Sequence, residues 1–326
     1  MELVAINNSE VISELSTPEA SDNRFMVANT EPIPFQLLKE KCTIPVFSKD
    51  NESTISHQEF IEVVGQAAHL AFSKERILDP AIRVSHPIKG RIPSAVGKPA
   101  SDLVENEKTL YYERMAFVYE VPTIEENVNG NKLSLTVGGV RAYNSENLYG
   151  KKTEERFKVF IGFKNWVCIN LSVTSDGFRE EIRVRTTAEL FNQVYRLFAM
   201  FNFQNQINSL RDLANYVLTE RQFAHLIGRL RMYPYLKSEE KISIPALHLG
   251  DSQTNSVIRD YYQDKSFCRD DAGNINLWRF YNLLTGANKS SYIDTFLDRT
   301  VNTLTFSQVL LDCLRMGRNL WYLDGQ

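Results

Sequence analysis

The spacing of apolar residues along this chain of 326 residues changes from mainly strand-like to helical at about residue 187. Before that point, short stretches alternate between apolar and polar residues or are rich in Tyr, Phe and Val, which is typical of β-strands. After it, apolar residues recur at helical spacing almost to the end. Strands followed by helices are the α+β order. The sequence therefore predicts an α+β fold, with an antiparallel or mixed β-sheet in the N-terminal and middle part followed by a helical C-terminal half.

Three parts are predicted along the chain. Residues 1–30 are rich in Ser, Asn, Glu and Thr, which predicts a flexible N-terminal arm with a short helix around Glu10–Leu15. Residues 31–187 are predicted to form a mainly β-sheet domain with one helix, and residues 188–326 a helical part that packs on the sheet. The last two parts form either separate domains or one continuous domain, because the length suits both.

The strand predictions come from β-rich stretches bounded by turn signals. Asn129-Gly130 predicts a hairpin, since both residues tolerate positive φ. Gly138-Gly139 inside a strand predicts a bulge or a close approach by another chain or ligand. The predicted strands are Ala81–Pro87, Leu110–Pro122, Lys132–Tyr143, Phe157–Phe163, Asn165–Val173 and Glu180–Thr187, and Ile92–Lys98 is predicted as a loop.

Capping boxes predict where three helices begin. In each box a Ser or Thr accepts from a backbone N–H, and a Glu or Gln three residues later reaches back. The boxes begin at Ser56, Thr186 and Thr219. Further helices are predicted by apolar spacing alone, at Asp251–Gln263, Leu277–Leu284, Tyr292–Thr300 and Ser307–Leu314.

Composition narrows the function classes. The chain is 43% apolar and 24% charged, as in ordinary globular proteins. Its net charge of −3 argues against generic nucleic-acid binding but allows a local basic face. Four widely spaced cysteines form no CxxC pair, the start lacks a secretory signal, and no apolar run suits a spanning helix. We expect a cytoplasmic protein with reduced thiols and no membrane contact.

Catalytic signatures are missing from the sequence. It contains no GxxxxGK[ST], GxGxxG, GxSxG, HExxH or EF-hand pattern. We therefore predict no cofactor, no metal site and no catalytic residues that local sequence can identify. An enzyme whose site assembles from distant residues, around Arg83, Arg183 and Asp176, stays open as an alternative.

Basic and aromatic residues are interleaved in the strand region. Cations that hold phosphates beside rings that stack bases are what binding of single-stranded nucleic acid requires. The competing interpretation is structural, since aromatic residues on strands mostly build a core and Lys or Arg on the other face is solvated. Arg183 and Arg185 lie on one face of the same predicted strand. The candidate nucleic-acid-binding residues are Arg83, Lys89, Arg91, Tyr111, Tyr112, Arg183 and Arg185.

Two motifs carry a family resemblance. Residues 160–171, FIGFKNWVCINL, contain Val-Cys-x-Asn, and residues 278–285, WRFYNLLT, contain Asn-x-x-Thr. In order and separation they resemble the phage/plasmid-like proteins of unknown function, above all a subgroup from Bacteroides-type bacteria and their mobile elements, over residues 55–320. One departure is Leu171, where the broader group usually has Gly. The motif residues are Trp166, Cys168, Asn170, Trp278, Tyr281 and Asn282.

The resemblance implies a mobile-element accessory protein and supplies no established activity. We expect Cys168 and Asn170 to share a strand face, either as a buried structural pair or as a reactive thiol with a helper amide. Together with the basic-aromatic strands, the resemblance leads to the hypothesis of a non-enzymatic binding protein acting on single-stranded DNA or a nucleoprotein intermediate. The alternative is a protein–protein factor that sequesters a host defence or replication protein. The sequence predicts no oligomeric state.

Overall fold

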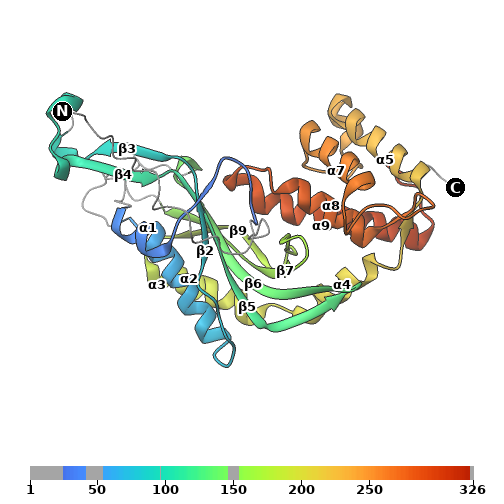
Figure 1. Ribbon diagram of the computed structural model, residues 1–326, viewed down its shortest axis with the longest axis horizontal. Helices are drawn as coiled ribbons and strands as arrows, with labels where there is room; N and C mark the ends of the chain where they lie inside the picture. The colour runs from blue at the N-terminus through green and yellow to red at the C-terminus, as the bar shows by residue number, and fades with distance from the viewer. Residues whose placement is uncertain (1–24, 42–53, 96, 146–153, 324–326) are drawn as a thin grey trace, which may run out of the picture.

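The computed structural model describes residues 25–41, 54–95, 97–145 and 154–323. In this part of the chain a strongly curved sheet carries helices on both faces (Figure 1). The strand order is β1-β2-β5-β6-β7-β8, β9 also pairs with β7, and every pairing is antiparallel. The α+β prediction is confirmed, and its sheet is antiparallel rather than mixed. The strands are β1 (Glu31–Pro32), β2 (Ala81–Val84), β5 (Arg114–Val128), β6 (Asn131–Ala142), β7 (Glu155–Asn165), β8 (Leu171–Ser172) and β9 (Phe178–Val184).

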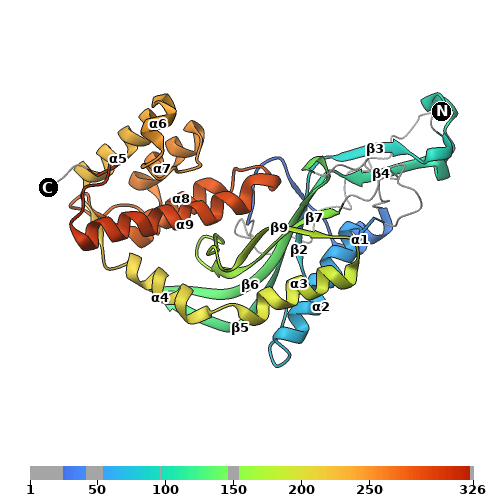
Figure 2. The same cartoon turned by 180° about the vertical axis from the view of Figure 1, so that it is seen from behind.

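The helices divide between the two faces of the sheet. Those on the convex face, which lie side by side in Figure 2, are α2 (His57–Ala71) and α3 (Thr187–Met200), with α1 (Phe35–Lys41) beside α2. On the concave side, α9 (Ile293–Met316) contacts β5, β6 and β8. The helices that complete the C-terminal half are α4 (Phe203–Leu213), α5 (Glu220–Met232), α6 (Ser238–Lys241), α7 (Asp251–Gln263) and α8 (Leu277–Asn288), with a small ladder of β10 (Val217–Leu218) and β11 (Ile275–Asn276).

Alternation along the strands separates two apolar cores. The larger core continues from the convex face into the C-terminal helices, and Phe60 of α2 lies there against Phe117 and Phe157. The smaller core lies between the concave face and the start of α9, and it includes Phe25 and Met26. Both residues are buried, so the first described residues already belong to a core. Residues 1–24 and the helix predicted at Glu10–Leu15 lie outside the described residues.

The paired glycines of β6 explain how closely α2 approaches the sheet. A Cβ atom on Gly139 would lie 2.4 Å from Cζ of Phe60, which no side chain could occupy without displacement. On the neighbouring Gly138 it would lie 2.1 Å from the carbonyl oxygen of Phe117. The close approach at Gly138-Gly139 is therefore made within the chain, by Phe60 on the convex face, and not by another chain or a ligand as predicted. The alternative prediction of a bulge is wrong, because β5 and β6 pair in continuous register at both glycines.

The capping boxes are found at two of the three predicted positions. Ser56 and Thr219 each accept from the third helical N–H, and Glu59 and Gln222 complete the boxes. Thr186 accepts from the N–H of Glu189 at 3.2 Å. The Glu189 carboxylate, however, accepts from the N–H of Arg185 at 2.8 Å. Because the predicted donor was the N–H of Thr186 itself, the capping box at this helix is incomplete.

Four predicted elements differ from the structure. The strand predicted at Asn165–Val173 is wrong, because β7 ends at Asn165 and a tight turn precedes β8. Cys168 and Asn170 therefore do not share a strand face. The helices predicted at Tyr292–Thr300 and Ser307–Leu314 are one continuous helix, α9. The strand predicted at Leu110–Pro122 is divided between β4 (Lys108–Tyr112) and β5, because the two pair with different partners.

A two-stranded ribbon projects from the sheet. It consists of β3 (Pro87–Arg91) and β4, and it continues β2 and β5 outward beyond the sheet edge (Figure 1). Three 3₁₀ turns, Pro93–Ala95, Ala100–Asp102 and Glu105–Glu107, form its tip. Among the helices of the described residues, none has the length and apolar character needed to cross a bilayer.

Candidate functional site

The two sequence motifs meet in one buried polar cluster, where the turn after β7 packs on α8. The side-chain amide of Asn170 donates to the carbonyl of Asn282 and to Oγ1 of Thr285, both at 2.9 Å. Nδ2 of Asn165 donates to Oδ1 of Asn282 at 3.0 Å. The thiol of Cys168 lies 3.4 Å from the same oxygen. Residues more than 110 positions apart in sequence are therefore joined directly through their side chains.

The turn itself is strained and strongly held. Ile169 has φ of 58°, a left-handed conformation that a β-branched residue rarely adopts. Such a residue persists only where its surroundings over-determine it. The N–H of Val167 donates to Oδ1 of Asn165 at 2.9 Å, and the Lys289 ammonium donates to the carbonyl of Cys168. The first bond closes the turn, and the second joins it to the residue that follows α8. Leu171, the residue at which the sequence departs from the motif it resembles, is buried in the smaller core.

The chemistry of Cys168 favours a structural role over a nucleophilic one. Burial raises the pKa of its thiol to about 12, although the nearby Lys289 partly opposes the shift. The thiolate is the nucleophilic form of cysteine, and a thiol with this pKa stays protonated at neutral pH. The buried structural pair is the interpretation that this geometry supports.

The aromatic motif residues have separate environments. Trp278 is fully buried, and its Nε1 donates to Oδ1 of Asn131 at 2.7 Å. Tyr281 is also fully buried, which raises the pKa of its hydroxyl. Trp166 differs, because 44% of it is exposed and the ammonium of Lys132 lies 4.5 Å from the centre of its ring. Two of the three rings thus support α8 and one faces solvent.

The candidate nucleic-acid-binding residues do not form one site. Arg83 is only 4% exposed, and its guanidinium donates to Oγ1 and to the carbonyl oxygen of Thr30, at 2.6 and 2.5 Å. It holds the segment before β1 and does not face a ligand. Asp176, offered with Arg83 and Arg183 as a non-local enzyme site, lies exposed in the turn before β9. The other six candidates lie on the ribbon and at the end of β9.

The ribbon carries four of the candidates. The register pairs Lys89 with Leu110 and Arg91 with Lys108, so the three cations share one face. The two tyrosines instead anchor its base. The ring of Tyr111 lies 6.0 Å from that of Tyr143, and the carbonyl of Tyr112 lies 2.8 Å from Nε2 of the buried His57.

A row of cations crosses the sheet where β5, β7 and β9 reach the edge that bears the ribbon. Arg114 pairs with Ala142 of β6, and Arg156 of β7 pairs with Arg183 of β9. Because side chains two residues apart share a face, Lys158 lies beside Arg156. Alternation around the apolar Phe157 was the signal by which sequence could have identified Arg156 and Lys158. We call Arg114, Arg156, Lys158 and Arg183 the cationic rim; Arg185 follows just after β9 and is exposed.

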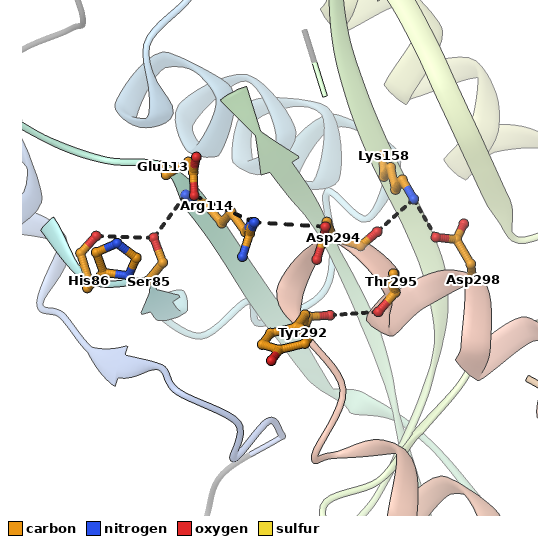
Figure 3. A network of polar contacts seen from close by, with 9 residues as sticks. All are labelled: Ser85, His86, Glu113, Arg114, Lys158, Tyr292, Asp294, Thr295 and Asp298. Carbon is orange, nitrogen blue, oxygen red and sulfur yellow. Dashed lines mark hydrogen bonds and ion pairs between the residues drawn. The ribbon is translucent and has the colours of Figure 1, made fainter. Parts of the chain in front are cut away.

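Carboxylates hold each cation of the rim. Glu181 lies 3.1 Å from Arg156 and 2.6 Å from Arg183. Lys158 donates to the carbonyl of Asp294 at 2.8 Å and to the carboxylate of Asp298, both on the first turns of α9 (Figure 3). Nε of Arg114 lies 4.0 Å from the Asp294 carboxylate. The start of α9 is therefore tied to the rim by charge.

A hollow of about 420 Å³ opens on this face. Three buried polar atoms where β5 meets the start of α9 lack a hydrogen-bond partner among the described residues: Nε of Arg114 and the Oδ1 atoms of Asp294 and Asp298. Buried polar atoms are normally paired, so such a group marks a place where water or a ligand can bind. The lining residues are Val140, Ala142, Ser145, Arg156, Phe157, Lys158, Glu180, Glu181 and Asp294.

Comparison with known proteins gives a family and no activity. No curated protein and no solved structure matches the chain. One family model, described as "Domain of unknown function, B. Theta Gene description", matches residues 5–323. The match includes both motifs and the cationic rim, and it agrees with the predicted membership of a family of unknown function with Bacteroides-type members. With nearly its whole length matched, the chain belongs to this family, DUF3871.

Proposed function

We propose that the chain is a non-enzymatic binding protein of a mobile genetic element, and that single-stranded DNA, free or within a nucleoprotein intermediate, binds along the cationic rim. The supporting observation is the row of Arg114, Arg156 and Arg183, contributed by three strands beside one hollow. The link to a mobile element comes from the resemblance of the two sequence motifs alone.

The spacing of the rim suits an extended polyanion. Neighbouring strands lie about 4.8 Å apart, so Arg114 and Arg156, two strands apart, are separated by about 10 Å. A strand of DNA that crosses the sheet at this edge meets one cation after another. Tyr292 is 60% exposed and directly precedes α9, two residues before Asp294, and its ring can stack on a base (Figure 3).

A phosphate that binds at the rim has to displace the carboxylates that pair with its cations. Arg156, Arg183 and Glu181 are each between 35% and 52% exposed at their side chains. Ion pairs this exposed contribute roughly 0–1 kcal/mol each. A phosphate can therefore replace Glu181 at small cost, and the bound state has charge-assisted hydrogen bonds to phosphate instead.

Fluorescence anisotropy with a labelled single-stranded oligonucleotide tests the proposal. We expect micromolar or tighter binding at low salt, with an affinity that falls as salt rises because neutralised phosphates release counterions. The double variant Arg156→Glu/Arg183→Glu should bind at least tenfold more weakly. Arg221→Glu, on an exposed position of α5, is the matched control and should bind like the wild type. The absence of binding at low salt would refute the proposal.

A polypeptide partner is the second candidate function, and one observation favours it. Four carboxylates face the four cations of the rim, so the surface is mixed in charge rather than basic. Such a surface suits a protein partner that carries both charges. A host protein retained by the wild type and lost with Arg156→Glu/Arg183→Glu, without any oligonucleotide binding, would support this alternative. The four carboxylates are those of Glu113, Glu181, Asp294 and Asp298.

A further inference from the structure

The projecting ribbon contains a second hollow, separate from the cationic rim. Its volume is about 670 Å³, larger than that of the rim hollow. It is formed where the 3₁₀ turns of the tip lie against the two strands. The residues that line it are Lys89, Gly90, Arg91, Ala100, Leu103, Glu105, Lys108, Thr109 and Leu110.

The folded-back tip gives this hollow its walls. Glu107 accepts from the N–H of Val104 at 3.2 Å and from the ammonium of Lys98. The hydrogen bond from Lys98 lowers the pKa of the Glu107 carboxyl. Gly97 has φ of 94°, a left-handed conformation that glycine adopts readily and that lets the chain turn there.

The lining combines positive charge with an apolar surface. Three cations, Lys89, Arg91 and Lys108, face one carboxylate, that of Glu105. The excess of positive charge suits an anionic group. Leu103 and other apolar side chains of the lining suit the flat body of a ligand that carries that group. A phosphate attached to a nucleobase through a sugar has this combination of properties.

The cations of the hollow are available to such a ligand. Lys89 is exposed, and its side-chain ammonium makes no hydrogen bond or ion pair with any residue that the structure describes. Lys108 lies 2.9 Å from Glu105, and both side chains are exposed, so a phosphate can replace the carboxylate easily. Arg91 donates from Nη1 to the carbonyl of Lys98, and a guanidinium has four further N–H donors.

We infer that this hollow binds the terminal nucleotide of a nucleic-acid strand, with the terminal phosphate held by Lys89, Arg91 and Lys108. The inference rests on the proposed function, because the rest of the strand would run along the ribbon to the cationic rim. Lys108 and Arg114 are six residues apart, at most about 20 Å along the ribbon. A strand held at its end would thus be led to the rim within a few nucleotides.

The experiment compares two oligonucleotides of one sequence, with a terminal phosphate or with hydroxyl groups at both ends, on the full chain. We expect the phosphorylated strand to bind at least fivefold more tightly. Lys89→Glu/Lys108→Glu should abolish this difference, because the terminal phosphate loses the ammonium groups that hold it. Lys265→Glu, an exposed lysine of the helical part, is the control and should keep the difference. Calorimetric titration with adenosine monophosphate measures the hollow without the rim.

The outcomes separate the two proposals. Equal affinity for both oligonucleotides, with both weakened by Arg156→Glu/Arg183→Glu, would overturn the terminal site and keep the rim. Binding of adenosine monophosphate that is lost in Lys89→Glu/Lys108→Glu, without oligonucleotide binding at low salt, would keep the hollow and overturn the rim. Failure of the nucleotide to bind at millimolar concentration, with no preference for the phosphorylated strand, would overturn the inference whatever the rim does.

Discussion

The side-chain amide of Asn170 donates to the carbonyl oxygen of Asn282 at 2.9 Å, across 112 positions of sequence. This bond joins the turn after β7 to the middle of α8. It also explains why the two short motifs occur together: one supplies a strained turn and the other supplies the oxygens that hold it. The buried cluster thus connects the sheet with the C-terminal helices.

Replacing Asn170 by Ala should weaken this connection. The carbonyl of Asn282 and the hydroxyl of Thr285 would each lose a buried donor, which costs about 1–3 kcal/mol of unfolding free energy. Urea unfolding followed by circular dichroism measures the loss. Asn106→Ala, at an exposed position of the ribbon tip, should change stability by less than about 0.5 kcal/mol. Equal effects of the two substitutions would contradict a structural role for Asn170.

Stability should fall in mild acid because of His57. Burial, together with the charge of Arg141, lowers the pKa of His57 to about 3, against 6.5 for the exposed side chain. Between these pH values the unfolded chain binds a proton that the folded chain does not. The contribution is therefore complete above pH 6.5 and decreases as pH falls toward 3.

The size of this effect can be isolated by substitution. Between pH 7.5 and pH 5 the wild type should lose about 2 kcal/mol more unfolding free energy than His57→Gln, which has no titrating group at this position. Urea unfolding at the two pH values gives the comparison. An identical pH dependence of both proteins would show that His57 titrates normally in the folded state.

Adding a methyl group at Gly139 should separate α2 from the sheet. The new Cβ would lie 2.4 Å from Phe60 and 2.8 Å from the carbonyl of Lys158, so Gly139→Ala should destabilise by about 1–3 kcal/mol. Gly228→Ala is the matched control. No atom lies within 4 Å of the added group on α5, where Ala should stabilise the helix by about 0.5–1 kcal/mol. Thermal unfolding of both variants should therefore shift in opposite directions.

Removing the charge of Asp298 should strengthen oligonucleotide binding at the rim. Asp298 holds the ammonium of Lys158, and Asp298→Asn leaves that charge for a phosphate. We expect a gain in affinity of about two- to fivefold, the range that a partly exposed ion pair can contribute. Asp271→Asn, at an exposed position in the turn before β11, serves as the control in the same anisotropy titration. A lower affinity of the Asp298 variant would contradict competition between carboxylate and phosphate.

The order of elements could be predicted because it depends on local periodicity. The alternation before residue 187 and the helical spacing after it are properties of short windows, and so are the capping boxes at Ser56 and Thr219. The closeness required at Gly139 could also be read from sequence, since glycine inside a strand usually marks an approach. The identity of the approaching residue could not be predicted, because Phe60 lies 79 positions away in the sequence.

Where some strands end, and which residues form a binding site, could not be predicted from the sequence. Both depend on contacts between residues that are far apart along the chain. Asn165–Val173 has the composition of a strand, yet bonds to Asn282 and Thr285 of α8 and to Lys289 after it hold its middle in a turn at Ile169. Arg83 has the character of a ligand-binding residue, yet Thr30 takes up its guanidinium.

The cationic rim separates most clearly what the sequence predicts from what the tertiary structure decides. Alternation alone places Arg156 and Lys158 on one face of a strand. Only strand order and register bring Arg114 and Arg183 into the same row, and only the packing of α9 places Asp294 and Asp298 opposite them. The sequence by itself therefore determined the fold class and the ends of several helices, since these follow from neighbours along the chain. Tertiary structure decided which charges meet, because that depends on pairings between residues far apart in sequence.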